Sequence, residues 1–155
     1  MKSIHEWFGE YSVSHQNPIN KKIHFFAVPA IYLTVFGMMW HIPMPFASLS
    51  EQQITWPLLL AIPVLLFYFN LSRAIGVGMT IFTAFVVLFV RWFESEVEFS
   101  LTLSSALFFA FLWVLQFIGH AIEGKKPSFF KDLQFLLIGP AWILGFVLNK
   151  IGIRY

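Results

Sequence analysis

Residues 54–90 read ITWPLLLAIPVLLFYFNLSRAIGVGMTIFTAFVVLFV and carry a single charge, on Arg73. This stretch contains two apolar runs, Ile54–Leu71 and Ile75–Val90, with only three residues between them. A transmembrane helix needs about 20 apolar residues to cross ~30 Å of hydrocarbon, so each run is near the lower length limit for a span. The short linker predicts that the two runs form a tight helical hairpin.

Three further apolar stretches lie outside this hairpin, and they are Ile23–Ile42, Phe99–Ile122 and Leu133–Leu148. Together the five stretches predict an all-α fold, a multi-pass transmembrane helical bundle that forms one integral-membrane domain over residues 1–155. We expect about five spans. Four spans are the alternative, because the last stretch is short and could be re-entrant or lie partly in the interface.

The composition supports a lipid environment. Of the 155 residues, 58% are hydrophobic and 12% are charged, against roughly 25% charged in an ordinary soluble domain. The formal charge of +2 and the scattered basic residues argue against nucleic acid as a partner. The absence of cysteine excludes disulfides and thiolate metal sites. The compact chain favours a bacterial inner membrane, with the endoplasmic reticulum as the other possibility.

Basic residues near the span ends indicate the orientation, because cytoplasmic loops carry an excess of Lys and Arg. With five spans and a cytoplasmic N-terminus, seven basic residues lie inside and three outside, and the reverse orientation exchanges these numbers. The inner seven are Lys2, Lys21, Lys22, Arg73, Lys125, Lys126 and Lys131. The sequence therefore predicts a cytoplasmic N-terminus.

This topology brings three histidines, His15, His24 and His120, to the cytoplasmic boundary. His41 lies 17 residues after His24, which is ~25 Å along a helix, so the two cannot share a site. Asn17 followed by proline predicts a helix start between His15 and His24. The chain can therefore fold His15 back toward the helix face that carries His24, although the spacing does not show that it does.

The end of the fourth stretch carries a polar stripe. Gln116, His120 and Glu123 follow the spacing i, i+4, i+7 on one helix face, and Gly119 beside them leaves room for close approach. Polar groups at this depth normally face the bundle interior. Three imidazoles, or two with a carboxylate, suit a mononuclear Fe(II) or Zn(II) centre. Interfacial anchoring of separate histidines is the simpler alternative, and a haem between His24 and His120 is another.

Two motifs resemble those of a known family. The first runs from His15-Gln16-Asn17-Pro18 through Lys21-Lys22-Ile23-His24-Phe25 to Val28-Pro29. The second comprises Gln116-Phe117-Ile118-Gly119-His120 and Glu123-Gly124-Lys125-Lys126-Pro127, continuing to Gly139-Pro140. Both are similar to motifs of a family of small membrane proteins, formerly a domain of unknown function. Its characterised fungal member is the Fe(II)-dependent 2-hydroxy fatty acid dioxygenase of the endoplasmic reticulum.

The resemblance implies α-oxidation, in which a 2-hydroxy long-chain fatty acid reacts with O2 and loses one carbon as CO2. It implies Fe(II) ligands at His15, His24 and His120, with Glu123 as a further ligand or orienting group. The acyl chain would lie among the apolar spans and the head group at the cytoplasmic face. Weaker candidates for substrate binding are Asn17, Asn20, Gln116, Lys21 and Lys125.

Two other functions remain open on the sequence. The first is a metal-dependent membrane lipid hydrolase, which would use the same ligands and a metal-activated water. The second is a noncatalytic lipid-binding protein with interfacial histidines. The sequence favours no oligomeric state, no substrate chain length, and neither iron nor zinc by spacing alone.

Overall fold

The computed structural model of the chain describes residues 2–45, 54–126 and 134–155. Within these ranges it is all-helical, which confirms the predicted fold class. The helices are α1 (Ile4–Ser12), α2 (Pro18–Met39), α4 (Trp56–Leu71), α5 (Arg73–Glu96), α6 (Leu101–Glu123) and α7 (Phe135–Lys150).

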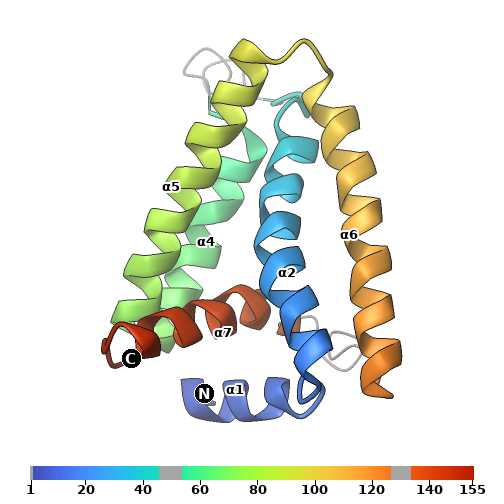
Figure 1. Cartoon of the computed structure of the whole chain (residues 1–155). Coiled ribbons are helices and arrows are strands. Elements are labelled where there is room, and N and C mark those ends of the chain that lie inside the picture. The colour runs from blue at the N-terminus through green and yellow to red at the C-terminus, as the bar shows by residue number, and fades with distance from the viewer. Residues whose placement is uncertain (1, 46–53, 127–133) are drawn as a thin grey trace.

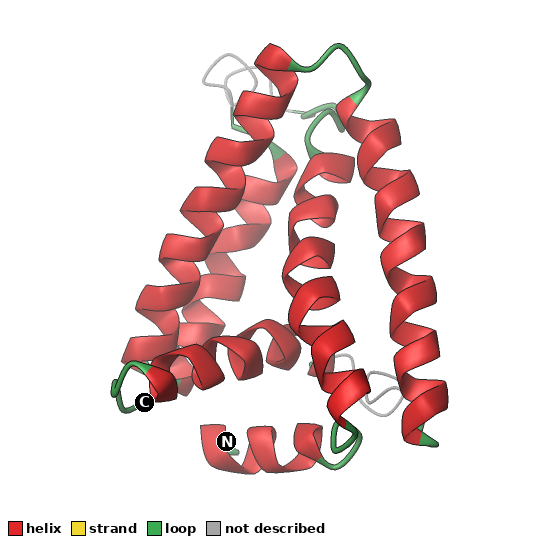
Figure 2. Cartoon of the chain, in the orientation of Figure 1, coloured by secondary structure: helices red, strands yellow, loops and turns green. Residues whose placement is uncertain are grey.

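Four of the helices, α2, α4, α5 and α6, run lengthwise through the bundle, whereas α1 and α7 cross beneath one end of it (Figures 1 and 2). The hairpin prediction is confirmed, because Ser72 alone, in an extended conformation, separates α4 from α5. The expected fifth span, whose first residue Leu133 lies outside the described residues, corresponds to the crosswise α7. Its direction therefore differs from that of the other apolar helices (Figure 1).

Among the described residues, α2, α5 and α6 are long and apolar enough to cross a membrane, with 22, 24 and 23 residues. The apolar helices α4 and α7 are shorter, with 16 residues each. Large apolar side chains on the outside of the bundle are exposed, such as Leu88 (68%), Ile81 (66%) and Leu107 (65%). An exposed apolar surface of this kind fits lipid as the surrounding solvent.

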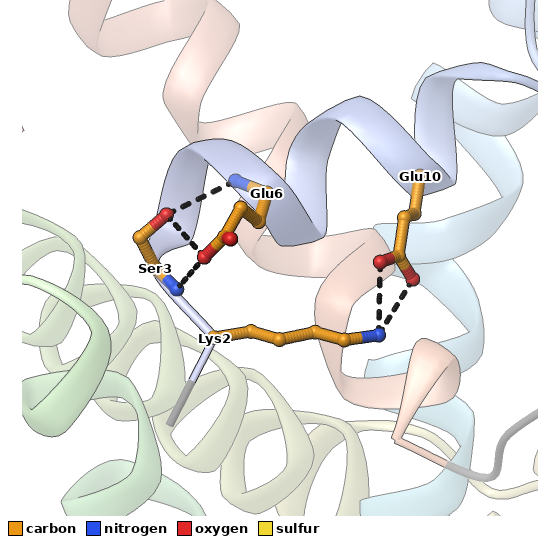
Figure 3. A network of polar contacts seen from close by, with 4 residues as sticks. All are labelled: Lys2, Ser3, Glu6 and Glu10. Atoms are coloured by element: carbon orange, nitrogen blue, oxygen red, sulfur yellow. Dashed lines mark hydrogen bonds and ion pairs between the residues drawn. The ribbon is translucent and has the colours of Figure 1, made fainter.

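The first helix, α1, was not predicted. It begins with a capping box, in which the Ser3 hydroxyl accepts from the Glu6 N–H and the Glu6 carboxylate accepts from the Ser3 N–H (Figure 3). Lys2, which precedes the helix, also forms an ion pair with Glu10. Trp7 and Tyr11 on its other side are buried against the bundle. The Ser-x-x-Glu pattern was therefore a readable helix-start signal.

At the opposite end of the bundle, polar side chains join α2, α5 and α6. The Trp40 indole N–H donates to Glu94 Oε2 at 2.9 Å, and His41 Nε2 lies 2.6 Å from Glu94 Oε1. His41 Nδ1 also lies 3.3 Å from the Thr102 hydroxyl. These contacts hold His41 at the far end of α2 from His24, which confirms that the two histidines do not share a site.

Candidate metal centre and adjoining cavity

Three imidazoles meet at the end of the bundle where α1 and α7 cross it. The His15 ring centroid lies 4.3 Å from that of His24 and 5.1 Å from that of His120, and the last two are 4.9 Å apart. One ligand nitrogen of each residue lies within 4.8 Å of the others. The side chains are nearly inaccessible, with exposed fractions of 1%, 2% and 5%. The rings leave no space for a haem between His24 and His120.

Backbone carbonyls orient two of the rings. His15 Nδ1 lies 2.7 Å from the Tyr11 carbonyl oxygen, and His24 Nδ1 lies 3.0 Å from the Asn20 carbonyl oxygen. Because a carbonyl oxygen only accepts, each Nδ1 carries the proton and each Nε2 has a free lone pair. Histidines that bind metals in proteins usually donate the N–H of their other ring nitrogen to such a partner, which orients the ring.

The unpaired nitrogens support a metal centre. His15 Nε2 and His120 Nδ1 are buried and have no hydrogen-bond partner. A buried polar atom left without a partner costs about 1–3 kcal/mol, so such atoms call for an explanation. A cation bound among the three rings would supply the missing partner. Three neutral imidazole donors fit Fe(II) or Zn(II) with coordination positions left open.

The environment of His15 keeps its imidazole neutral. Its ring stacks on Tyr11, with centroids 4.1 Å apart and an interplanar angle of 7°, and it contacts Trp142 of α7 at 5.6 Å. Burial lowers the pKa of His15 to about 4, although the Tyr11 carbonyl acts in the opposite direction. The residue is therefore in the metal-binding form at neutral pH.

The turn between α1 and α2 folds His15 back toward His24, as the sequence allowed. Asn17 caps α2, since its side-chain oxygen accepts from the Ile19 N–H at 2.8 Å. The Glu123 carboxylate accepts from the backbone N–H groups of Gln16 and Asn17 at 2.9 and 2.8 Å. The last residue of α6 thus fixes the turn that carries His15.

Asn20 extends this connection into the interior. Its amide nitrogen donates to the Ser14 carbonyl at 3.1 Å and to Glu123 Oε2 at 3.0 Å. A Cβ at Gly119 would clash with the Asn20 side-chain oxygen. The glycine therefore allows α6 to approach α2 closely enough for His120 to reach His24, as its position beside the polar stripe suggested.

A cavity of about 470 Å³ extends from the histidines into the bundle. Pockets of this size hold ligands as large as typical drugs. Its walls come from one face each of α2, α4 and α6, with Tyr11 and the start of α7 at the histidine end. Gln116 also lines it, and the Gln116 side-chain oxygen is buried without a hydrogen-bond partner. Most of the remaining wall is aliphatic or aromatic.

The sequence-predicted site residues separate into three groups. His15, His24, His120 and Gln116 line the cavity, whereas Glu123, Asn17 and Asn20 form the hydrogen bonds behind the histidines. Lys125 Nζ donates to the Val13 carbonyl at 2.7 Å. Neither Lys125 nor Lys21 of α2 is among the residues that line the cavity.

Sequence reasoning missed two aromatic residues of the site. Tyr11 lies one helical turn before His15, and burial raises the pKa of its phenol. The Trp142 indole N–H donates to the Ser12 hydroxyl at 2.9 Å and so fastens α7 to the end of α1. The i, i+4 spacing of Tyr11 and His15 was visible in the sequence. Nothing in the sequence placed Trp142 beside them.

Comparison with known proteins is consistent with this site. The family model described as 2-hydroxy-palmitic acid dioxygenase Mpo1-like matches residues 1–151, nearly the whole chain. The chain belongs to the Mpo1-like family. A curated relative, the 2-hydroxy-palmitic acid dioxygenase MPO1 of Saccharomyces cerevisiae, is 26% identical over 146 residues. That alignment covers 93% of this chain and 79% of the yeast protein.

No solved structure matches the chain. The expected resemblance to the 2-hydroxy fatty acid dioxygenase family is thus confirmed by the Mpo1-like match. The preference for a bacterial inner membrane gains no support, since the relative named above is a yeast protein.

Proposed function

We propose that this Mpo1-like protein is an Fe(II)-dependent dioxygenase that shortens 2-hydroxy long-chain fatty acids by one carbon. The observation that carries the proposal is the convergence of three buried imidazoles at one end of an apolar cavity. The reaction balances as a 2-hydroxy acid and O2 giving the shorter carboxylic acid, CO2 and water. The family relationship supports the substrate class.

His15, His24 and His120 would hold the iron through one nitrogen each. When bound, a ferrous ion with open positions supplies chelation of the 2-hydroxy carboxylate and the reduction of O2. The Gln116 side-chain oxygen, buried at the cavity wall without a partner, is available to accept a hydrogen bond from the substrate hydroxyl. The aliphatic walls of the cavity would bind the acyl chain and exclude water from the reacting end.

Glu123 acts in this proposal as a positioning residue. Its oxygens accept hydrogen bonds from two backbone N–H groups and the Asn20 amide. These contacts fix the turn beside His15, so the carboxylate supports a ligand without itself joining the metal. This role replaces the alternative in which Glu123 is a fourth ligand.

The proposed site lies in the membrane at its cytoplasmic face. Nine of the ten Lys and Arg residues are described, and eight of them belong to the end where α1 and α7 lie, with Arg91 at the other end. This distribution supports a cytoplasmic location for the histidines. The basic residues are divided between the two ends more unevenly than in the five-span topology, because the crosswise α7 brings Lys150 and Arg154 to the basic end.

The test is O2 uptake by protein purified anaerobically and loaded with Fe(II), using 2-hydroxypalmitate as substrate. We expect uptake that matches the pentadecanoate and CO2 formed, and its loss in His120→Ala together with bound iron. Exposed His5→Ala is the matched control, because His5 lies outside the cavity. Product formation that continues unchanged without O2 would reject a dioxygenase and favour a hydrolase.

A further inference from the structure

The imidazoles and the Gln116 amide lie at one end of the cavity, and the Tyr32 hydroxyl farther along α2 is hydrogen-bonded to the Thr83 hydroxyl at 2.9 Å. On α2 the cavity is lined from His24 at one end, through Val28 and Val35, to Met39 at the other. These two end positions are separated by 15 residues, or ~22 Å at 1.5 Å per residue. Beyond the histidines and Gln116, the lining is dominated by aliphatic and aromatic side chains. Such a space suits one long apolar chain attached to one polar head group.

Part of the wall at the far end of the cavity consists of tightly packed side chains. Phe36 and Ala61, both in the cavity wall, belong to a buried cluster with Trp40, Val86 and Val90. Close-packed cores resist expansion, so this part of the wall is rigid. Met39, which is half-buried at the same end, is the adaptable part of the wall, since methionine fills irregular spaces with three rotatable bonds.

We infer that Met39 and the end of the cavity around it set the longest acyl chain the site accepts. This inference rests on the proposed function only for the position of the head group at the histidines. An extended chain advances about 1.2 Å per bond, as an extended polypeptide does over its three backbone bonds, so ~22 Å holds about 18 bonds. The site should therefore prefer acids of about 16 to 18 carbons.

Substitutions along the lined face of α2 test the inference through their order. Val35 is four residues nearer the histidines than Met39, which is ~6 Å or about five bonds of the chain. Val35→Trp should therefore shorten the preferred acid by about five carbons more than Met39→Trp. Met39→Ala should lengthen the preferred acid by about two carbons.

Met38 provides a matched control. It neighbours Met39 in α2, is also half-buried, and does not line the cavity. Met38→Trp and Met38→Ala should leave the chain-length preference unchanged. The opposite effects expected for Met39→Trp and Met39→Ala separate a length limit from general damage, because damage lowers the binding of all chain lengths together.

Two measurements keep this inference distinct from the proposed function. The first is turnover of 2-hydroxy acids of about 10 to 20 carbons, and the second is competition of saturated fatty acids without the hydroxyl for a bound fluorescent fatty acid. If binding shifts in the expected order but no 2-hydroxy acid is oxidised, the chain-length assignment stands and the dioxygenase fails. If oxidation occurs with one unshifted length profile in all variants, or no fatty acid binds, the assignment is overturned.

Discussion

Replacement of Glu123 by alanine separates a positioning carboxylate from a metal ligand. The side chain accepts three hydrogen bonds, from the Gln16 and Asn17 N–H groups and from the Asn20 amide. Hydrogen bonds to charged groups contribute about 1.5–3 kcal/mol each when buried. Glu123 is half-exposed, so solvent screening reduces each to about 1 kcal/mol. We therefore expect Glu123→Ala to lower the free energy of unfolding by about 2–3 kcal/mol.

The effect on the metal follows from the geometry of the turn. Without Glu123 the segment carrying His15 is held less firmly, while all three imidazoles remain. Loss of an outer partner of a ligand typically lowers metal affinity 10–100-fold. We expect Glu123→Ala to bind one Fe(II) or Co(II) per chain with that reduced affinity. The optical spectrum of bound Co(II) should be unchanged, because the atoms that coordinate it are the same.

Denaturant unfolding in detergent and Co(II) titration measure the two effects. Glu98→Ala is the control, because Glu98 is an exposed glutamate between α5 and α6. A Glu123→Ala protein with a changed Co(II) spectrum, or with no metal at saturating concentration, would refute the positioning role. Unaltered stability and unaltered affinity would refute the role of the three hydrogen bonds.

Two further predictions concern pH and topology. Burial lowers the pKa of His15 from 6.5 to about 4. Between these pH values the unfolded chain binds a proton at this residue and the folded chain does not. The free energy of unfolding therefore falls as the pH is lowered, by up to about 3 kcal/mol in total. Thermal unfolding of the metal-free protein from pH 7 to 4 should show this loss. His15→Phe, which keeps the stack on Tyr11, should reduce the dependence of stability on pH. An equal dependence in both proteins would contradict the assignment of this effect to His15. Because α7 lies at the same end as α1, both termini should lie on the cytoplasmic side. In this cysteine-free chain, Lys2→Cys and Arg154→Cys should resist an impermeant thiol reagent in cells, whereas Glu98→Cys should react; labelling of Arg154→Cys alone among the terminal pair would instead support five spans.

Much of the fold could be predicted because hydrophobic length is a local property of the sequence. The runs 54–71 and 75–90 with their short linker became α4 and α5, and the Asn17-Pro18 pair became the start of α2. The sequence did not predict the direction in which the last apolar helix runs. An apolar run of 16 residues can cross a membrane or lie across one end of a bundle, and its composition does not distinguish these. Packing against α1, through Trp142 and Ser12, decides it for α7.

The candidate site shows the same division. The sequence alone predicted that His15, His24 and His120 lie at one end of the bundle and that Gln116, His120 and Glu123 share a helix face, because helical periodicity and the order of apolar stretches can be read along the chain. Only the tertiary structure decided that the three rings meet and that Glu123 holds the turn before α2. The contacts of His120 and Glu123 with residues 15–24 join positions 96 to 107 apart in the chain. They depend on how closely α6 approaches α2 at Gly119, and this distance is set by packing.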